Sequence, residues 1–367
     1  MWPPPCVSGA PGERHRGQVD GANSSDPVST DMARIGIIGV GAVGARLARQ
    51  LVSTDSDSVV LRDENRSRVE LVAESLGEKA SIDTGSLDSP LDVDVAVLAG
   101  PARTHVEQAA RFIRAGVSVV STGDNIDDVR GLLALDTEAR NRKVNLVVGA
   151  GFAPGLTCLL AAHGSRLFDR VEEIHVAKAG TGGPACARQH HQAVGRGAVD
   201  WRNGVWENRP GGSGRELCWF PEPIGAQDCY RAALPDALVL VPAFEGIQRV
   251  TARVAATRRD RLTARLPMLW PTHPEGGPGA VRVELRGERN GTRDTAVLGA
   301  MDRPAVAAGA VAAVAARWII TDQLRRTGAG GLAELVEALP FLQELARRGI
   351  KVAIFEGESD PPVGQSA

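Results

Sequence analysis

The sequence predicts an α/β protein with a doubly wound parallel sheet and a second α+β domain that carries a largely antiparallel sheet. Up to about Gly155, short continuous apolar runs alternate with segments at helical spacing, which is the pattern of βαβ units. Beyond Gly155, longer segments alternate apolar and polar residues, as strands do when one face is exposed. Hydrophobic residues make up 43% of the 367 residues, which is enough to fill ordinary globular cores.

The first half contains five expected strands joined by four expected helices. Each strand is apolar along most of its length, because helices cover both faces of a parallel sheet. The expected strands are 34–40, 58–63, 94–100, 117–123 and 144–151, and the expected helices are 42–52, 65–77, 104–116 and 127–143.

The second half begins with an expected helix at 155–168 and a strand at 171–180, followed by a stretch without a simple pattern from about 181 to 235. Period-two alternation predicts strands at 248–257 and 280–300, and Asn290-Gly291 inside the latter is typical of a two-residue hairpin turn. A helix is expected at 302–324, with Pro304 in its first turn. Its apolar core, 305–316, is shorter than the ~20 residues of a membrane span. The last expected elements are 331–349 and 351–357.

The net charge and the cysteine content argue against several classes of partner and site. The net charge of -2 gives no reason to expect nucleic acid or an anionic membrane. Five cysteines without a CxxC pair, and no apolar secretory segment, favour reduced thiols and a cytoplasmic location. Cys186, His190 and His191 lie close together in sequence, but a zinc site usually has paired ligands at two separate places. No second pair is present, so we expect no metal.

Three glycines follow the first expected strand in the stretch GVGAVG, residues 39–44. In a dinucleotide-binding βαβ unit, the first glycine permits the tight turn, the second lets the backbone approach a pyrophosphate, and the third lets the helix pack on the strand. These roles fall to Gly39, Gly41 and Gly44. The amides of the next helical turn, including Ala42 and Val43, would face the phosphates. A strand before the loop and a helix after it favour a Rossmann site for NAD or NADP.

Asp63 ends the second expected strand, about 20 residues beyond the glycines, where a ribose-binding carboxylate is expected. Such a carboxylate would bind the ribose hydroxyls and repel a 2′-phosphate. Arg62 argues the other way, because a guanidinium can pair with that phosphate. We therefore favour NAD slightly and keep NADP open.

The third and fourth expected strands end at the same edge of the sheet. Gly100 and Pro101 close the third strand and Thr122 closes the fourth, and ligands of such sheets bind at the carboxyl ends of the strands. We expect these three residues to line the cofactor. Asp124 reaches the same edge and could contact a ligand, although capping of the next helix is the preferred interpretation.

Several stretches, in this order, resemble the saccharopine dehydrogenase-like oxidoreductases. They are GVGAVGARLARQL, VVLRDEN, the run from VVSTGDN to GAGFAPGL, and DRPAVAAGAVAAVAARWI. The resemblance covers about Arg34 to Ile320, closely over the nucleotide half and loosely over the rest. It implies a Rossmann domain, a second α/β domain inserted before a returning C-terminal helix, and nicotinamide chemistry at a C–N bond of an amino acid–carbonyl adduct. Residues 180–238 match no substrate motif of that family, so the substrate does not carry over.

The resulting domain organisation has five parts. A disordered N-terminal arm without apolar periodicity is expected at 1–31. It precedes a dinucleotide-binding Rossmann domain at 32–155, a substrate and dimerisation domain at 156–302, C-terminal helices returning to the Rossmann domain at 303–357, and a frayed tail at 358–367. A homo-oligomer, such as a dimer, is expected by analogy with the fold alone.

Hydride transfer also requires a residue that moves a proton, and near neutral pH histidine is the first choice. His191 and His190 lie in the stretch without a simple structural pattern and are the leading catalytic candidates. Lys178, at the end of an expected strand, is the third candidate. Arginine forks would bind a carboxylate-bearing small-molecule substrate, and the candidates for this role are Arg188, Arg196, Arg202 and Arg215.

The leading hypothesis is an NAD(P)-dependent oxidoreductase that transfers hydride to or from a C–N or C–O carbon of a small amino or keto acid. One alternative is a sugar or polyol dehydrogenase of the inositol dehydrogenase-like type, against which we find no EKP-type lysine motif after the third strand. The other alternative is a non-catalytic protein that senses the dinucleotide.

Overall fold

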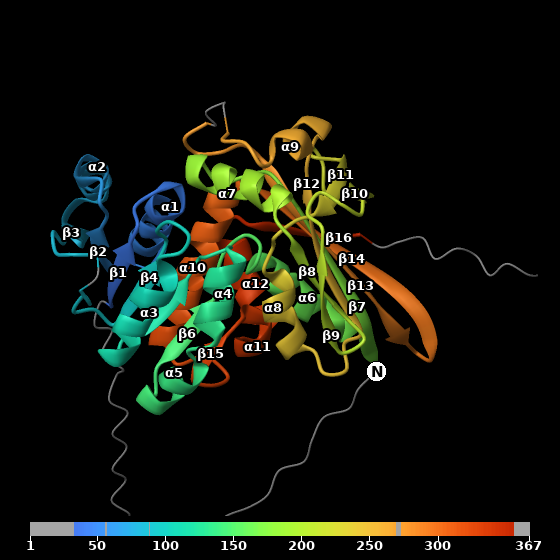
Figure 1. The fold of residues 1–367 in the computed structure, drawn as a ribbon. Coiled ribbons are helices and arrows are strands. Elements are labelled where there is room, and N and C mark those ends of the chain that lie inside the picture. The colour runs from blue at the N-terminus through green and yellow to red at the C-terminus, as the bar shows by residue number, and fades with distance from the viewer. Residues whose placement is uncertain (1–32, 56, 88, 269–272, 356–367) are drawn as a thin grey trace, which may run out of the picture. The chain divides into compact units, whose positions relative to one another are not determined.

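The computed structural model describes residues 33–355, except 56, 88 and 269–272. The arm expected at 1–31 and the tail expected at 358–367 lie outside these residues. Within them, two sheets and their helices share one hydrophobic cluster, which runs from the first strand to the C-terminal helices. Figure 1 shows the strands of the first sheet at the left and those of the second at the right.

The first sheet is the predicted parallel sheet. Its order in the described chain is β15-β6-β5-β4-β1-β2-β3, and every neighbouring pair is parallel. The chain order reverses between β1 and β4, so a ligand crevice is expected at the carboxyl ends of these two strands. The strands are β1 (Arg34–Ile38), β2 (Ser58–Arg62), β3 (Ala80–Ile82), β4 (Val95–Leu98), β5 (Ser118–Ser121), β6 (Asn145–Val148) and β15 (Gly328–Gly330).

Helices connect these strands as the apolar periodicity predicted, with one difference. The helix expected at 127–143 is two helices, and both of them contact β6. Two three-residue edge strands, β3 and β15, escaped the sequence analysis because they are too short to show a period. The helices of this part are α1 (Ala42–Gln50), α2 (Arg66–Leu76), α3 (His105–Arg114), α4 (Ile126–Leu133) and α5 (Asp136–Arg142).

The second sheet is largely antiparallel, as predicted. Its path is β10-β11-β12-β7-β13-β14-β16, with β8 added beside β12 and β9 added beside β8, and only β12 and β7 pair in parallel. The strands are β7 (Arg170–Ala179), β8 (Ala198–Arg202), β9 (Val205–Arg209), β10 (Glu216–Trp219), β11 (Ala226–Arg231), β12 (Arg249–Ala255), β13 (Gly279–Arg289), β14 (Thr292–Asp302) and β16 (Lys351–Phe355).

Asn290 and Gly291 form the turn between β13 and β14, where Arg289 pairs with Thr292. Both turn residues have positive φ, 52° and 74°, as a type I′ hairpin turn requires. The Asn-Gly prediction is therefore confirmed, and the turn determines the register of the longest strand pair in the sheet.

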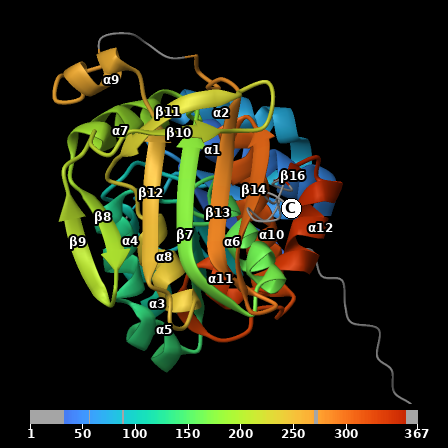
Figure 2. The same cartoon turned by 90° about the vertical axis from the view of Figure 1, so that its right-hand side faces the viewer.

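The two faces of the second sheet differ in chemistry. Ile174, Val176 and Val250 point into the hydrophobic cluster, whereas the alternate residues Glu173, His175 and Thr251 lie on the other face. Helices α6 (Leu156–Gly164) and α8 (Asp236–Leu240) contact strands of this sheet. Figure 2 looks onto the polar face, where β12, β7, β13 and β14 run in front of the helices.

The stretch without a sequence pattern contains α7 (Pro184–Gly195), strands β8 to β11, and a turn that leads into α8. The helix α9 (Arg258–Thr263) follows β12 and contacts α7. Strands β8 and β9 alternate weakly, because Val205 and Trp206 are exposed in the pair, and this explains why their period was not recognised.

The C-terminal part contributes to both sheets. Helix α10 (Pro304–Ile320) packs on α1 so closely that a Cβ at Gly309 would lie 2.8 Å from the backbone nitrogen of Leu47. Helices α11 (Leu332–Leu335) and α12 (Ala338–Arg347) follow β15. The expectation for 303–357 was a return to the Rossmann domain, but β16 pairs with β14 in the second sheet. Strand β13 occupies one edge of β14 and leaves the other edge for β16, so this segment extends the second sheet.

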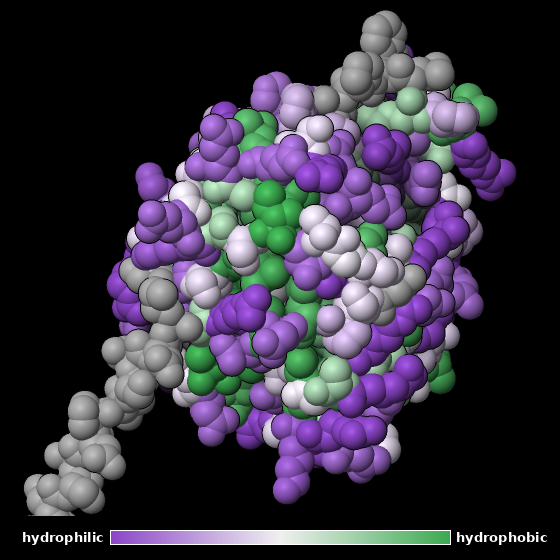
Figure 3. Space-filling model, turned by 90° about the vertical axis from the view of Figure 1, so that its left-hand side faces the viewer, coloured by the Kyte–Doolittle hydropathy of each residue, from purple (hydrophilic) through white to green (hydrophobic). Residues whose placement is uncertain are grey.

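The surface of the first-sheet side includes exposed apolar residues. Figure 3 shows hydrophobic side chains in the middle of this face with hydrophilic ones around them, and Leu71 on α2 and Ile82 on β3 are exposed by 67% and 41%. No helix in the described part of the chain is both long and apolar enough to cross a bilayer.

Candidate functional site

The glycine loop between β1 and α1 has the geometry that its sequence predicted. Gly39 has φ of 95°, and a Cβ there would lie 2.5 Å from the backbone nitrogen of Gly100. A Cβ at Gly44 would overlap the carbonyl oxygen of Gly39, so this glycine permits the close helix–strand packing. A Cβ at Gly41 would meet no atom within 4 Å. Gly41 therefore borders open space, where a ligand can approach the backbone.

The first turn of α1 meets no side-chain cap among the described residues. The amides of this turn, which include those of Ala42 and Val43, lack intrahelical partners and lie at the positive end of the helix dipole. The start of α7 lies beside them, since a Cβ at Gly183 would be 3.0 Å from that of Ala42. Together these contacts place the second domain against the anion-binding end of α1.

Asp63 lies beside the glycine loop. Its carboxylate accepts hydrogen bonds from the backbone N–H of Val40 at 2.6 Å and of Asn65 at 2.8 Å. Arg68 approaches the same carboxylate at 3.7 Å. These bonds hold the carboxylate at the end of β2, and the remaining lone pairs can accept from ribose hydroxyls.

Arg62, which the sequence offered as a partner for a 2′-phosphate, is buried and fully engaged. It pairs with the Asp83 carboxylate at 2.7 Å and donates to the carbonyl oxygens of Ser86 and Ser89 at 2.7 and 2.5 Å. Its side chain is only 3% exposed. Arg62 therefore organises the β2–β3 edge, and its guanidinium does not face the crevice.

The ends of β4 and β5 form the other wall of the crevice. Pro101 is exposed and Gly100 is half-buried beside Gly39, while the Thr122 hydroxyl donates to the Leu98 carbonyl oxygen at 3.1 Å. Beneath them, His105 bonds to the Ser121 hydroxyl at 2.8 Å and to the carbonyl oxygen of Gly100 at 3.1 Å.

Burial lowers the pKa of His105, so the ring is neutral. It donates through Nε2 to Gly100 and accepts from Ser121 through Nδ1. This histidine therefore supports the strand ends and is not a solvent-facing acid.

Lys178 and Asp124 form an ion pair next to this crevice. Lys178 lies at the end of β7 with its side chain 8% exposed, and its Nζ is 3.4 Å from the Asp124 carboxylate. Gln189 of α7 donates to the other oxygen of Asp124. The capping role expected for Asp124 is wrong, because Asn125 accepts the backbone N–H groups of Asp127 and Asp128. Asp124 is therefore available to Lys178.

His190 also borders Lys178. Its Nε2 lies 3.4 Å from the carbonyl oxygen of Ala255, and its Nδ1 is buried without a partner among the described residues. Burial, together with the charge of Lys178, lowers the pKa of His190 to about 4. Burial, together with the charge of Asp124, raises the pKa of the Cys186 thiol to about 11. Both side chains are neutral near pH 7.

Asp236, at the start of α8, is a member of the site that the sequence analysis missed. It is fully buried, accepts a hydrogen bond from the Thr157 hydroxyl at 2.7 Å, and leaves its other carboxyl oxygen without a partner in the described chain. Burial raises its pKa, against the nearby charge of Lys178. Thr157 directly follows the GAGFAPGL stretch, which was the only sequence signal for this contact.

His191, the first catalytic candidate of the sequence analysis, has a different environment. Its Nε2 lies 2.9 Å from the carbonyl oxygen of Thr263 and 3.3 Å from that of Leu266. The ring therefore links α7 to the segment after α9. His191 is adjacent to His190 in sequence, but the described contacts connect it to backbone carbonyls and not to Lys178.

The four arginines expected to bind a substrate carboxylate are dispersed. Arg188 and Arg196 are exposed, Arg215 pairs with Asp228 at 3.0 Å, and Arg202 lines a small cavity on the polar face of the second sheet. None of them contacts the Lys178–Asp124 pair in the described structure. The residues 33–355 with their gaps also contain no cluster of three or more potential metal ligands.

Comparison with known families agrees with this geometry. Residues 33–122 match the GFO/IDH/MocA family model, described as an oxidoreductase family with an NAD-binding Rossmann fold. The matched part runs from β1 to the end of β5, and so contains the glycine loop, Asp63, Gly100 and Thr122. A search of curated proteins found no match to this chain.

Solved structures with a similar fold include saccharopine dehydrogenase (L-Glu forming) from Saccharomyces cerevisiae, with a TM-score of 0.66 and 15% identity, covering 88% of this chain and 100% of that one. DAP dehydrogenase from C. glutamicum has a TM-score of 0.47 and 16% identity, with 86% and 98% coverage. A probable dehydrogenase from Thermotoga maritima has a TM-score of 0.46 and 12% identity, with 85% and 93% coverage.

The resemblance expected from the sequence is confirmed at the level of the fold. The similarity to the yeast enzyme extends over both sheets, since it covers 88% of this chain. Residues 33–122 are similar to an oxidoreductase family with an NAD-binding Rossmann fold.

Proposed function

We propose that this protein is an NAD(P)-dependent oxidoreductase that acts on a C–N or C–O carbon of a small amino or keto acid. The observation that carries the proposal is the position of the Lys178–Asp124 pair. Asp124 follows β5 at the carboxyl edge of the parallel sheet, and α7, which supplies Gln189 to Asp124, begins beside Ala42 of the glycine loop, whose Gly41 borders open space. The fold similarity to saccharopine dehydrogenase supports a substrate with an amino acid part.

The residues around Gly41 fit a dinucleotide. Open space borders Gly41, and no side chain caps the first turn of α1. The amides of Ala42, Val43 and Gly44 would hold the pyrophosphate. Asp63 would hold the ribose, and Gly100, Pro101 and Thr122 would border the nicotinamide side. The nicotinamide, when bound, supplies or accepts the hydride.

Lys178 is the group we assign to proton transfer. In the reductive direction its ammonium donates a proton to the oxygen or nitrogen of the substrate, and in the oxidative direction its amine removes that proton. Asp124 holds Lys178 in place and is held in turn by Gln189. His190 is neutral and half-buried, and Asp236 is fully buried with its pKa raised by that burial, so both limit the access of water to Lys178. We assign His191 to the anchoring of α7 and not to chemistry.

NAD is the cofactor we favour. The guanidinium of Arg62 is engaged with Asp83, Ser86 and Ser89, so the argument for NADP that rested on this residue is lost. Asp63 remains at the ribose position and would repel a 2′-phosphate. Arg68, 48% exposed and 3.7 Å from Asp63, is the nearest cation that could partly offset this repulsion.

A polyol or other neutral hydroxyl compound is the second candidate substrate. It is favoured by the absence of any guanidinium in contact with Lys178 and Asp124 in the described structure, since a carboxylate substrate would be expected to use one. A lysine beside a carboxylate is sufficient to move a proton from a neutral alcohol.

Two measurements test the proposal. NADH and NADPH are titrated against the protein by fluorescence, and turnover is then measured with amino acids, keto acids with ammonia or an amine, and polyols. Saturable binding with turnover of an amino or keto acid supports the first candidate, and turnover of polyols alone supports the second. Binding without turnover of any compound would instead support a dinucleotide sensor.

A further inference from the structure

Two arginines face each other without an intervening acid on the polar face of the second sheet. Strand β8 pairs with β12 in antiparallel register, and Arg202 lies directly opposite Arg249. Like charges at directly opposed positions destabilise a strand pair. The side chain of Arg202 is exposed and has no hydrogen bond or ion pair among the described residues. No acidic side chain in the described structure therefore pairs with the guanidinium of Arg202.

The carboxylate that pairs with Arg249 in the described structure is shared with other groups. Glu173 lies 3.8 Å from Arg249, 3.9 Å from Arg286, and 2.9 Å from the His175 ring. Its charge therefore offsets that of Arg249 only in part.

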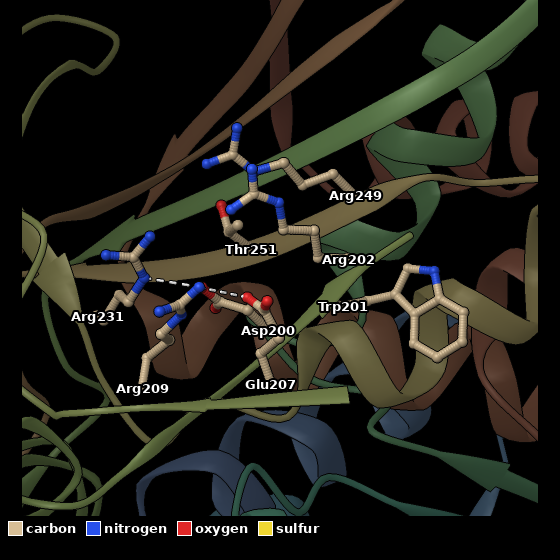
Figure 4. Close-up of a pocket in the computed structure, with 8 residues that line it drawn as sticks. All are labelled: Asp200, Trp201, Arg202, Glu207, Arg209, Arg231, Arg249 and Thr251. Atoms are coloured by element: carbon tan, nitrogen blue, oxygen red, sulfur yellow. Dashed lines mark hydrogen bonds and ion pairs between the residues drawn. The ribbon is translucent and has the colours of Figure 1, made fainter. Parts of the chain in front are cut away.

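A small cavity lies at this pair. Figure 4 shows the guanidiniums of Arg202 and Arg249 next to each other, close to Thr251. The cavity has a volume of about 20 Å³, and its lining residues are Asp200, Trp201, Arg202, Glu207, Arg209, Arg231, Arg249 and Thr251. It admits one small group and not a large molecule.

The cavity lining has more positively than negatively charged side chains. Arg231 pairs with Asp200 at 2.7 Å, and Arg209 pairs with Glu207 at 2.6 Å. Both carboxylates of the lining are thereby used, so Arg202 has no partner in the lining and Arg249 has only the shared Glu173 outside it. The lining is net cationic, and the guanidiniums of Arg202 and Arg249 lie next to each other in it.

We propose that this cavity is an oxyanion site that binds a dianionic phosphate group, either as free phosphate or at the end of a small phosphate ester. A tetrahedral dianion presents oxygens to two guanidinium forks at once, and it removes the repulsion between Arg202 and Arg249. The site lies on the face of the sheet opposite to Lys178. Val254 is the register partner of Lys178, and Thr251 is three positions from Val254 on β12, so their side chains point to opposite faces. The cavity is therefore separate from the proposed catalytic site.

The test is a calorimetric titration with inorganic phosphate at constant ionic strength, carried out on the Gly41→Asp variant. This background prevents phosphate from occupying the glycine loop, so the result does not depend on the proposed cofactor site. We expect saturable uptake of one ion per chain. Arg202→Gln and Arg249→Gln should each weaken it at least 10-fold, and Arg202→Lys should weaken it less.

The matched control is Arg142→Gln, which changes an exposed arginine of α5 that has no partner among the described residues. Its phosphate affinity should equal that of the background. Melting curves without phosphate show whether each variant is folded, and loss of the repulsion predicts that Arg202→Gln melts no lower than its parent. Glycerol phosphate distinguishes the source, because a free-phosphate site excludes the ester and an ester site binds it. Absence of saturable uptake, or equal uptake by Arg202→Gln, would overturn the proposal.

Discussion

The two halves of the candidate active site are made of different parts of the chain. The glycine loop is six consecutive residues, and it offers backbone amides whose access depends on missing side chains. The Lys178 cluster combines side chains from β7, α7, α8 and the end of β5, and Lys178 and Asp124 are 54 positions apart. The glycine loop is local and could be predicted from the sequence, whereas the Lys178 cluster forms only when the second sheet has folded.

This difference has an energetic counterpart. The glycine loop needs little desolvation of charge, because backbone amides are neutral dipoles already oriented by α1. The Lys178 cluster buries ionisable groups, and burial shifts several of them towards their neutral forms, including His190, Cys186 and Asp236. Substitutions in the loop should therefore affect binding, and substitutions in the cluster should affect turnover and the pH dependence of stability.

The largest effect is expected for Gly41→Asp. A Cβ at this position meets no protein atom within 4 Å, so the fold should survive, but the carboxylate would occupy and repel the pyrophosphate position. Titration with NADH should show no saturable binding. Gly197→Asp, at an exposed glycine elsewhere, serves as the control. Unchanged affinity in Gly41→Asp would contradict the assignment of the loop.

Next in size is Lys178→Met, which keeps the aliphatic stem and removes the amine. Loss of a general acid–base group should lower kcat by about 10²- to 10⁴-fold, while cofactor affinity stays within error because Lys178 is not part of the loop. Lys143→Met, at an exposed lysine of the first domain, is the matched variant. A kcat equal to that of the parent would exclude Lys178 from proton transfer.

His190→Gln should alter the pH dependence of stability. The folded-state pKa of His190 is about 4 and its ordinary value is 6.5, so the unfolded chain binds more protons between these values. Stability is therefore complete above pH 6.5 and is lost as the pH falls towards 4, by on the order of 3 kcal/mol at most. The variant should lack this loss.

Urea unfolding at pH 7 and pH 5 measures the effect, as the difference between parent and variant. This comparison cancels Asp57, whose pKa is raised by burial to about 6 and whose contribution runs in the opposite direction, falling as the pH rises from about 4 to 6. An equal change in the free energy of unfolding between pH 7 and pH 5 in the two proteins would mean that His190 does not titrate in this range.

A smaller effect is expected at the ribose position. The parent should bind NADH at least about 10-fold more tightly than NADPH, since Asp63 repels a 2′-phosphate and Arg62 is engaged elsewhere. Asp63→Asn should reduce this ratio, whereas Asp83→Asn, which loosens Arg62, should raise NADPH affinity only if Arg62 then reaches the crevice. An NADPH preference in the parent would reverse the cofactor assignment.

The smallest effect is expected for His191→Ala. Its hydrogen bonds to the carbonyl oxygens of Thr263 and Leu266 are worth about 1 kcal/mol of stability, and kcat should fall by less than about 3-fold, as expected for a group outside the proton path. Steady-state kinetics and a melting curve separate the two roles. A drop comparable to that of Lys178→Met would restore His191 as the catalytic residue.

Particular residues show how far sequence reasoning reaches into the site. The roles of Gly39 and Gly44 could be read directly, because a positive φ and a close backbone approach leave glycine as the only choice. Asp124 was expected to cap the helix, but Asn125 caps it, because either residue type can do so and only packing decided which one does. Asp236 was not considered at all, since a carboxylate at a helix start usually faces solvent.

The sequence by itself determined the parallel sheet, the glycine loop and the Asn290-Gly291 hairpin, because each depends on periods and backbone angles within about a dozen residues. Only the tertiary structure decided the partner of Lys178, the engagement of Arg62, the neutral state of His190 and the opposition of Arg202 and Arg249. These properties depend on which side chains meet across strands and on how much water is excluded, and residues far apart in the chain bring about both.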